Sequence, residues 1–163
     1  MKRKIIRSII MAGILMAAIG LTYAAEPSFT YTMPEGWKVE SPKGTVATAT
    51  SLDNNVHIKI YEFANKDKQN ALQLCEKQLA RGKHVKVLNP PTDMSKMKDR
   101  FGADSVAKMQ LVMKRPDGAE VSYRAFVFVK GGTFVVIEAY ATKEATKEVF
   151  DQANAVIENF KFK

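Results

Sequence analysis

The second half of the chain shows the clearest alternation of apolar and polar residues. Within residues 105–114 one face of an extended segment is apolar, which is typical of a half-buried strand. Two further strands are predicted over 119–130 and 133–141, joined by Gly131-Gly132, a pair favoured in tight hairpins. Near these glycines both strands are apolar on both faces. Such strands are covered on both faces, so they predict the centre of a sheet between two layers.

Shorter strands are predicted nearer the N-terminus. Their segments are 28–33, 37–40, 45–51 and 56–63. Turn-forming residues separate these strands, among them Pro34-Glu35-Gly36 and Asp53-Asn54-Asn55. Four strands are therefore predicted before the first helix.

Two segments show helical spacing instead. Apolar side chains recur every three or four residues between Leu72 and Leu79, which predicts a helix over 66–81. Asn65 is its expected N-cap, and Gly82 is expected to follow its last turn. A second apolar stripe predicts a C-terminal helix. Its members are Ala145, Val149, Ala153, Val156, Ile157 and Phe160.

The remaining segment is weakly patterned. A short strand is predicted over 85–88, ended by Asn89-Pro90-Pro91, and then a loop over 92–102, either irregular throughout or with one helical turn. Neighbouring strands joined by tight turns are antiparallel, because a parallel pair needs a long crossover. The pattern as a whole predicts the α+β class, with an antiparallel β-sheet flanked by helices in an α/β/α sandwich.

The N-terminus has the layout of a secretory signal peptide. A basic start precedes an apolar run from Ile9 to Leu21, and small residues lead to a cleavage site expected after Ala24. An uncleaved anchor is disfavoured, because the run would rise about 20 Å as a helix and the hydrocarbon core is roughly 30 Å thick. We expect a signal peptide over 1–24, a short leader over 25–28 and a single domain over 29–163. The protein is expected to be periplasmic or extracellular.

This interpretation changes the charge of the protein. The formal net charge is +8, but four of the 25 Lys and Arg residues lie in the predicted signal peptide, which leaves +4. That value favours solubility and is not the basic footprint of a nucleic-acid-binding protein, so no nucleic-acid partner is expected. No integral membrane segment is expected after cleavage. No cysteine lies directly after the apolar run, so no lipid tether is expected either.

Two stretches of the chain resemble one family. Residues 29–44 (FTYTMPEGWKVESPKG) resemble the opening strand-turn-strand of PsbP-like proteins, the family of the photosystem II extrinsic protein PsbP and its non-photosynthetic bacterial exported relatives. Residues 149–163 (VFDQANAVIENFKFK) resemble their last helix and its Phe-containing tail. The resemblance implies a sheet between helices and mostly no catalysis; relatives are accessory or assembly factors or other exported proteins. Unlike many bacterial relatives, this chain lacks an acceptor cysteine, and no metal-binding residue set carries over.

Few side chains are candidates for reactive chemistry. Cys75 lies on the apolar stripe of the predicted helix and is interpreted as a core residue, the alternatives being an intermolecular disulfide or a reactive thiol. His57 and His84 are the only histidines, too few for a zinc site of three or four ligands. Asp53-Asn54-Asn55 lacks the spaced oxygens of a calcium loop. We therefore predict no catalytic residue, no metal site and no cofactor.

One polar set stands out on the predicted sheet. The first two, Ser122 and Arg124, share a strand face with Phe126 and Phe128. The neighbouring strand offers the other two. Its members are Ser122, Arg124, Glu138 and Tyr140. A groove formed by this set would take a small anionic or amphipathic ligand, because ligand pockets are mostly apolar with a few placed polar groups.

The expected function is that of an exported, non-enzymatic accessory or binding protein of the cell envelope. We expect a monomer whose partner is an envelope protein or complex. The alternatives are a small-ligand carrier that uses the predicted groove and, third, an enzyme. A partner-binding protein should have a flat, moderately apolar exposed patch. A small-ligand carrier should have an enclosed pocket holding Arg124 or Tyr140. An enzyme should have a cleft with convergent titratable groups.

Overall fold

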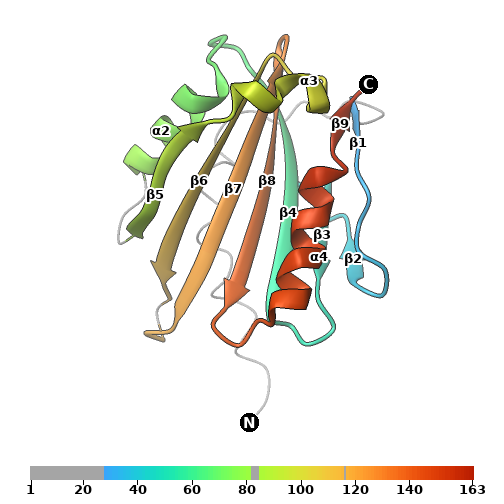
Figure 1. The fold of residues 1–163 in the computed structure, drawn as a ribbon, viewed down its shortest axis with the longest axis vertical. Coiled ribbons are helices and arrows are strands. Elements are labelled where there is room, and N and C mark those ends of the chain that lie inside the picture. The colour runs from blue at the N-terminus through green and yellow to red at the C-terminus, as the bar shows by residue number, and fades with distance from the viewer. Residues whose placement is uncertain (1–27, 82–84, 116) are drawn as a thin grey trace.

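Seven antiparallel strands form the central sheet of the computed structural model, which describes residues 28–81, 85–115 and 117–163 (Figure 1). Across the sheet, the strands are β2 (Lys38–Glu40), β3 (Ala47–Thr50), β4 (Val56–Ala64), β8 (Thr133–Thr142), β7 (Glu120–Lys130), β6 (Ser105–Lys114) and β5 (Val85–Asp93). The predicted α+β class is confirmed. The predicted signal peptide and residues 25–27 of the leader lie outside the described residues.

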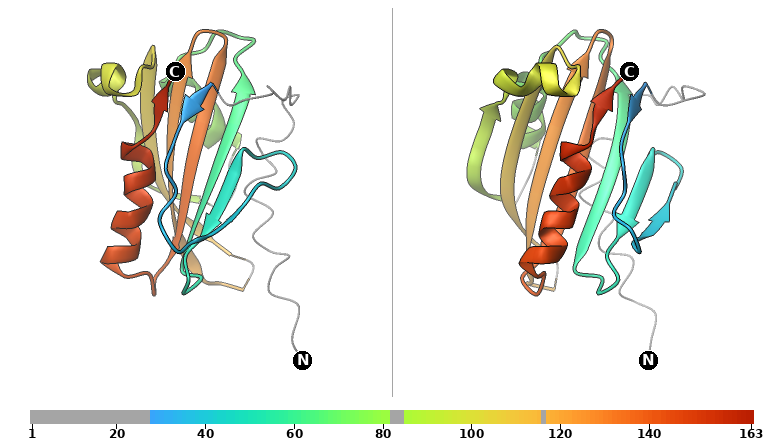
Figure 2. Two further views of the ribbon diagram at one scale, coloured as in Figure 1. Left: turned by 90° about the vertical axis from the view of Figure 1, so that its right-hand side faces the viewer. Right: turned by 45° about the vertical axis from the view of Figure 1, so that its right-hand side comes forward.

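Different elements cover the two faces of this sheet. The α4 face carries helix α4 (Lys147–Glu158), the 3₁₀ turn η1 (Ser95–Met97), the short helix α3 (Lys98–Phe101) and a two-stranded pair of β1 (Phe29–Thr30) with β9 (Lys161–Phe162). The opposite α2 face carries helix α2 (Ala71–Arg81). Figure 2 shows α4 lying along one side of the sheet, with β1 and β9 side by side at its end.

Each face has its own apolar core. On the α4 face Phe160 stacks on Phe128 with ring centroids 4.3 Å apart, and both side chains are buried. On the α2 face the helix inserts Ala71, Leu74 and Cys75 against the sheet. The strands β7 and β8 contribute buried residues to both cores, as their two-sided apolar pattern predicted.

The strongest sequence signals match the structure closely. The strand predicted over 105–114 is β6, and the hairpin predicted at Gly131-Gly132 joins β7 to β8. Gly131 has φ of 57°, a conformation that favours glycine. Thr146 caps α4, its hydroxyl accepting a hydrogen bond from the backbone N–H of Val149.

The first predicted strand was wrong in both length and pairing. Only Phe29–Thr30 is a strand, and it pairs with Lys161–Phe162 at the end of the chain rather than with its neighbour in the sequence. The Pro34-Glu35-Gly36 turn therefore connects two different layers. Trp37 follows that turn, and its indole N–H donates to Gln152 Oε1 of α4 at 2.9 Å.

The predicted start of the first helix was also wrong. The helix begins at Ala71, and Asn70 is its N-cap: the Asn70 side chain accepts from the N–H of Gln73, whose side chain accepts from the N–H of Asn70. Asn65 instead closes the preceding turn through two hydrogen bonds to the backbone of Gln69. Gly82 lies outside the described residues.

The strand predicted to end at Asn89-Pro90-Pro91 continues to Asp93. Its pairing with β6 shifts register on both sides of Asn89. Because β5 is an edge strand, its prolines lie where a missing N–H donor and local bulges are tolerated. The predicted loop over 92–102 consists of the end of this strand, η1 and α3.

Candidate functional site

The structure divides the four residues of the predicted groove between the two faces of the sheet. Arg124 of β7 lies opposite Ala139 of β8, whereas Glu138 lies opposite Ala125. Directly opposite residues share a face. Ser122 and Arg124 therefore lie on the α4 face, together with Phe126, as their shared strand face predicted. Glu138 and Tyr140 lie on the α2 face. The set does not form a single groove.

On the α2 face, Glu138 is a fully buried carboxyl group. Tyr123 donates to its Oε1 at 2.9 Å and Tyr140 to its Oε2 at 2.7 Å. Lys59 lies over the Tyr140 ring, with its Nζ 5.4 Å from the ring centroid. Both carboxyl oxygens thus have a donor, which is how buried polar groups avoid the cost of desolvation.

Burial controls the ionisation of this cluster. It raises the pKa of Glu138 above its usual value of 4.5, and the hydrogen bonds from Tyr140 and Tyr123 offset only part of that rise. Burial, with the Glu138 charge beside them, also raises the pKa of both tyrosines well above 10.0. These groups are enclosed in the core of the α2 face.

The interpretation of Cys75 as a core residue is confirmed. Its side chain has no exposed surface, and burial, followed by the Glu76 charge, raises the pKa of the thiol to about 12. A thiolate nucleophile needs a lowered pKa and access to its substrate, and Cys75 has neither.

We expect Cys75 to resist an aromatic disulfide reagent at neutral pH, reacting no faster than the protein unfolds. In denaturant the single thiol should react completely within the mixing time. Stoichiometric labelling of the folded protein within seconds would show that the α2 face opens readily and that the thiol is accessible.

Among the residues that the structure describes, none forms a metal-binding set with His57. Its Nδ1 lies 3.1 Å from the Thr50 hydroxyl, and burial lowers its pKa. Among residues 28–81, 85–115 and 117–163, no three His, Cys, Asp or Glu side chains are grouped to hold a metal ion. Asp53 closes its own turn, as expected, by accepting from the Asn55 N–H. His84 lies outside the described residues.

The α4 face contains a small pocket that includes Arg124. Its volume is about 130 Å³, and it is lined by Asn89, Lys108, Met109, Gln110, Arg124 and Phe126. We call it the cationic pocket. It lies on β5, β6 and β7, the part of the sheet that α4 leaves open, because α4 packs on β4 and β8 (Figure 1).

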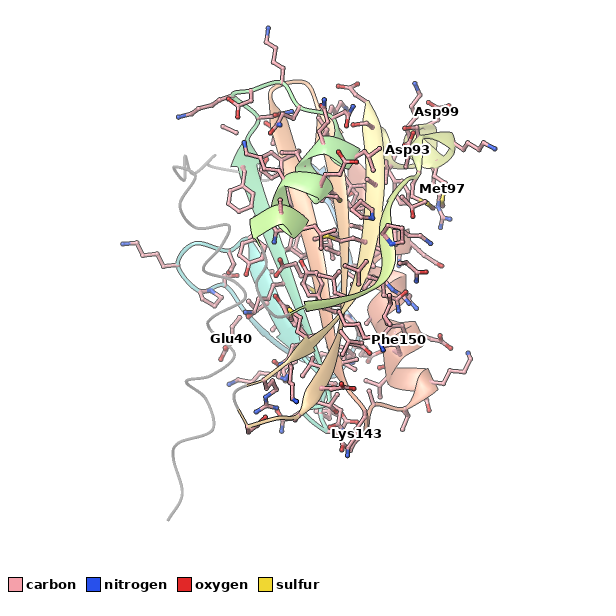
Figure 3. The ribbon with its side chains drawn as sticks, turned by 90° about the vertical axis from the view of Figure 1, so that its left-hand side faces the viewer. Glu40, Asp93, Met97, Asp99, Lys143 and Phe150 are labelled. Atoms are coloured by element: carbon pink, nitrogen blue, oxygen red, sulfur yellow. The ribbon has the colours of Figure 1, made fainter. Side chains whose placement is uncertain are left out.

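Arg124 is fixed in place by α4. Its Nη1 donates to Asn154 Oδ1 at 2.8 Å, and its guanidinium lies over the Phe150 ring at 4.7 Å from the centroid. Phe150 is labelled in Figure 3, which views the molecule from the side of β5. Burial lowers the pKa of Arg124, but an arginine remains charged at neutral pH. The pocket thus contains a held, half-buried cation.

Three other residues of the cationic pocket were not singled out in the sequence. Lys108 and Gln110 occupy the polar face of β6, and Asn89 lies on the continued part of β5, its Nδ2 donating to Gln110 Oε1 at 3.0 Å. The alternation of β6 places Lys108 and Gln110 on the face opposite Met109, so that signal was present in the sequence. Asn89 was missed because the strand was predicted to end there.

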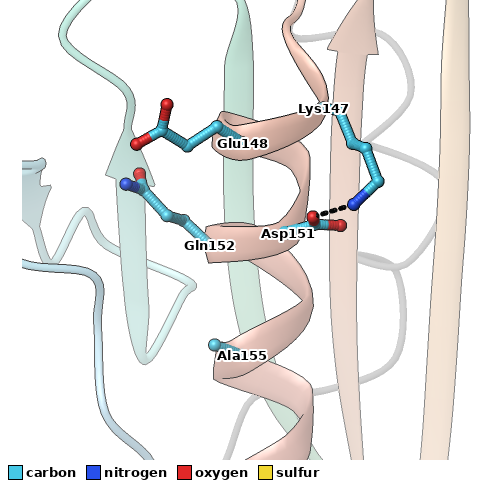
Figure 4. Close-up of a pocket in the computed structure, with 5 residues that line it drawn as sticks. All are labelled: Lys147, Glu148, Asp151, Gln152 and Ala155. Carbon is cyan, nitrogen blue, oxygen red and sulfur yellow. Dashed lines mark hydrogen bonds and ion pairs between the residues drawn. The ribbon is translucent and has the colours of Figure 1, made fainter.

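A larger depression runs along the outer side of α4, lined by Lys147, Glu148, Asp151, Gln152 and Ala155 (Figure 4). It is shallow and open to solvent, and three of its polar side chains already have partners in the protein. Lys147 pairs with Asp151, and Gln152 accepts from Trp37. A ligand there would have to displace these contacts, so the smaller cationic pocket is the better candidate.

Exposed apolar side chains occur at both edges of the sheet. Val39 and Leu52 lie near the β2 edge, and Val87 and Leu88 lie on β5. The second pair lies on the same strand as Asn89 of the cationic pocket. Isolated exposed apolar residues are normal, and these pairs alone define no site.

The sequence matches no protein-family model and no curated protein. The fold, in contrast, is similar to that of several solved structures. CyanoP, the cyanobacterial PsbP of Synechocystis sp. PCC 6803, aligns with a TM-score of 0.58 at 12% identity, over 90% of this chain and 99% of its own. LpqN of Mycobacterium tuberculosis, involved in cell envelope biogenesis, aligns with a TM-score of 0.53 at 14% identity, over 82% of each chain.

The Saccharomyces cerevisiae Ran-binding protein Mog1p is also similar, with a TM-score of 0.55 at 13% identity, over 83% of this chain and 90% of its own. The chain therefore has the fold shared by Mog1 and PsbP-like proteins, and the predicted resemblance is confirmed at the level of the fold. None of the helices in the described ranges is long and apolar enough to cross a membrane.

Proposed function

We propose that this protein is a non-catalytic binding protein exported to the cell envelope, and that the cationic pocket contacts its ligand or partner. The observation that carries the proposal is Arg124: a half-buried arginine held by Asn154 and Phe150 at the edge of a pocket that includes a second cation. An enclosed pocket holding Arg124 is what the ligand-binding alternative predicts.

The distribution of perturbed groups supports a role without catalysis. Burial raises the pKa values of Tyr123, Tyr140 and Glu138, and all three side chains are buried under the α2 face. The Cys75 thiol is buried there as well. A catalytic site requires such groups to converge where a substrate can reach them.

The similar solved structures support a binding role without catalysis, by analogy of fold. One protein of this fold binds Ran, and another is involved in envelope biogenesis. Because fold does not determine function, these names suggest a class of activity and no particular partner. With the predicted signal peptide, they favour binding to a component of the cell envelope.

Native mass spectrometry of the protein, gently isolated from the envelope of its own host, tests this proposal. We expect a chain that begins at Ala25 and carries an additional component, which is released on denaturation. A chain that retains residues 1–24 would contradict export with cleavage. A bare monomer would contradict stable binding.

A further inference from the structure

The charge of the cationic pocket is unbalanced. Lys108 and Arg124 line it, together with two amide side chains, and no carboxylate is among its lining residues. Within the described residues, neither cation takes part in an ion pair. Two acids elsewhere on this face have partners of their own: Asp151 pairs with Lys147, and Asp93 accepts from Ser95. The two positive charges therefore have no counter-charge from the pocket itself.

The geometry of Arg124 is suited to an oxyanion. One guanidinium nitrogen is used by Asn154, and the ring of Phe150 holds the guanidinium plane. The other N–H donors of this rigid fork are not needed for that contact, and guanidinium groups match the oxygens of phosphate and carboxylate. Because the side chain is already ordered, binding costs less conformational entropy than it would for a free surface arginine.

The size of the pocket limits what enters it. Its volume of about 130 Å³ is well below the roughly 300–1,000 Å³ of typical small-molecule sites. It accommodates a small ion or one charged end of a larger molecule. The wall formed by Asn89 and Gln110 adds amide groups, and Phe126 supplies an apolar side.

We propose that the cationic pocket binds a phosphate group, as inorganic phosphate or as a phosphomonoester at the end of a larger molecule. A pocket with two cations and no acid matches a group with close to two negative charges better than it matches a single carboxylate. This inference rests on the proposed binding function and names the chemical class that the pocket selects.

The test is a titration followed by ¹H–¹⁵N NMR, using the labelled protein as processed by its host, at neutral pH and constant ionic strength. Three probes are added separately in place of chloride: inorganic phosphate, a short-chain monoalkyl phosphate below its micelle concentration, and acetate. We expect saturable shifts at residues 108–110 and 124–126 with phosphate in the millimolar range, and weaker effects with acetate. A stronger response to the alkyl phosphate than to inorganic phosphate would support the phosphomonoester form.

Charge variants make the test specific. Lys108→Gln should weaken phosphate binding about tenfold, because a charge-assisted hydrogen bond is lost. Arg124→Lys, which keeps the charge but removes the fork, should weaken it similarly. Lys114→Gln is the matched control, since Lys114 is an exposed lysine of the same strand outside the pocket, and it should leave the affinity within about twofold.

Three results would overturn the inference: no saturable shift with either phosphate, acetate binding as tightly as phosphate, or equal affinity in Lys108→Gln and the unmodified protein. Failure here is distinguishable from failure of the proposed function. If phosphate does not bind but the pocket variants still lose the envelope component, the binding function stands and the phosphate inference falls. If phosphate binds but no envelope component is ever retained, the phosphate inference stands and the proposed binding function falls.

Discussion

Replacing Phe160 by alanine is expected to lower the free energy of unfolding by about 3–5 kcal/mol, a large part of the roughly 5–15 kcal/mol of a typical domain. Phe160 follows α4 and is 1% exposed. Its ring stacks on Phe128 of the sheet and lies 5.2 Å from both Phe29 and Phe162, measured between ring centroids. Removing it leaves a cavity where the sheet, α4 and the β1–β9 pair meet.

Urea unfolding, followed by circular dichroism, measures this loss. Leu52→Ala is the control, because Leu52 is 82% exposed and its truncation should change stability by no more than about 0.5 kcal/mol. Equal unfolding midpoints for Phe160→Ala and the unmodified protein would mean that the terminal pair and α4 do not pack on the sheet as described.

A second large loss of stability is expected from the double variant Tyr123→Phe/Tyr140→Phe. It removes both hydroxyl donors and leaves the two oxygens of the buried Glu138 without partners. Each lost partner should cost about 1–3 kcal/mol. Tyr31→Phe, a tyrosine of the other core, is the matched control. A double variant as stable as this control would contradict the described cluster.

Glu138 also gives stability a pH dependence of known sign. Its pKa is raised in the folded protein, so between 4.5 and that raised value the folded chain holds a proton that the unfolded chain has lost. The contribution of Glu138 to stability is therefore complete below pH 4.5 and is lost as pH rises through the window, with a slope of at most about 1.4 kcal/mol per pH unit.

Glu138→Gln should abolish this dependence, because the amide does not titrate and can still exchange hydrogen bonds with both tyrosines. Unfolding free energies measured from pH 4 to pH 8 test the sign of this pH dependence. The unmodified protein should lose stability relative to Glu138→Gln as pH rises. A constant difference between the two proteins across that range would contradict the raised pKa.

Local patterns were sufficient to predict most of the architecture. Strand β6, the β7–β8 hairpin and α4 follow from periodicity and turn residues within one segment each. The errors depend on distant contacts. Nothing local to Phe29 indicates that it pairs with Phe162, and nothing local to Pro90 shows that its strand lies at an edge of the sheet.

The predicted groove failed for a different reason. The two-residue turn pairs Lys130 with Thr133, and counting back from that pair places Ala139, not Glu138, opposite Arg124. The register was thus available in the sequence and would have separated the set. The cationic pocket needed more than register, since it depends on the bulged edge strand that brings Asn89 beside Gln110.

Binding at the open part of the α4 face can be tested by comparing three proteins isolated in parallel from the host envelope. They are the unmodified chain, Lys108→Gln/Arg124→Lys and Lys114→Gln, with folding checked by circular dichroism. Native mass spectrometry measures the fraction of each that retains its bound component. We expect the unmodified chain and Lys114→Gln to retain the component and the pocket variant to be bare. Equal retention by all three would place the binding surface elsewhere on the molecule.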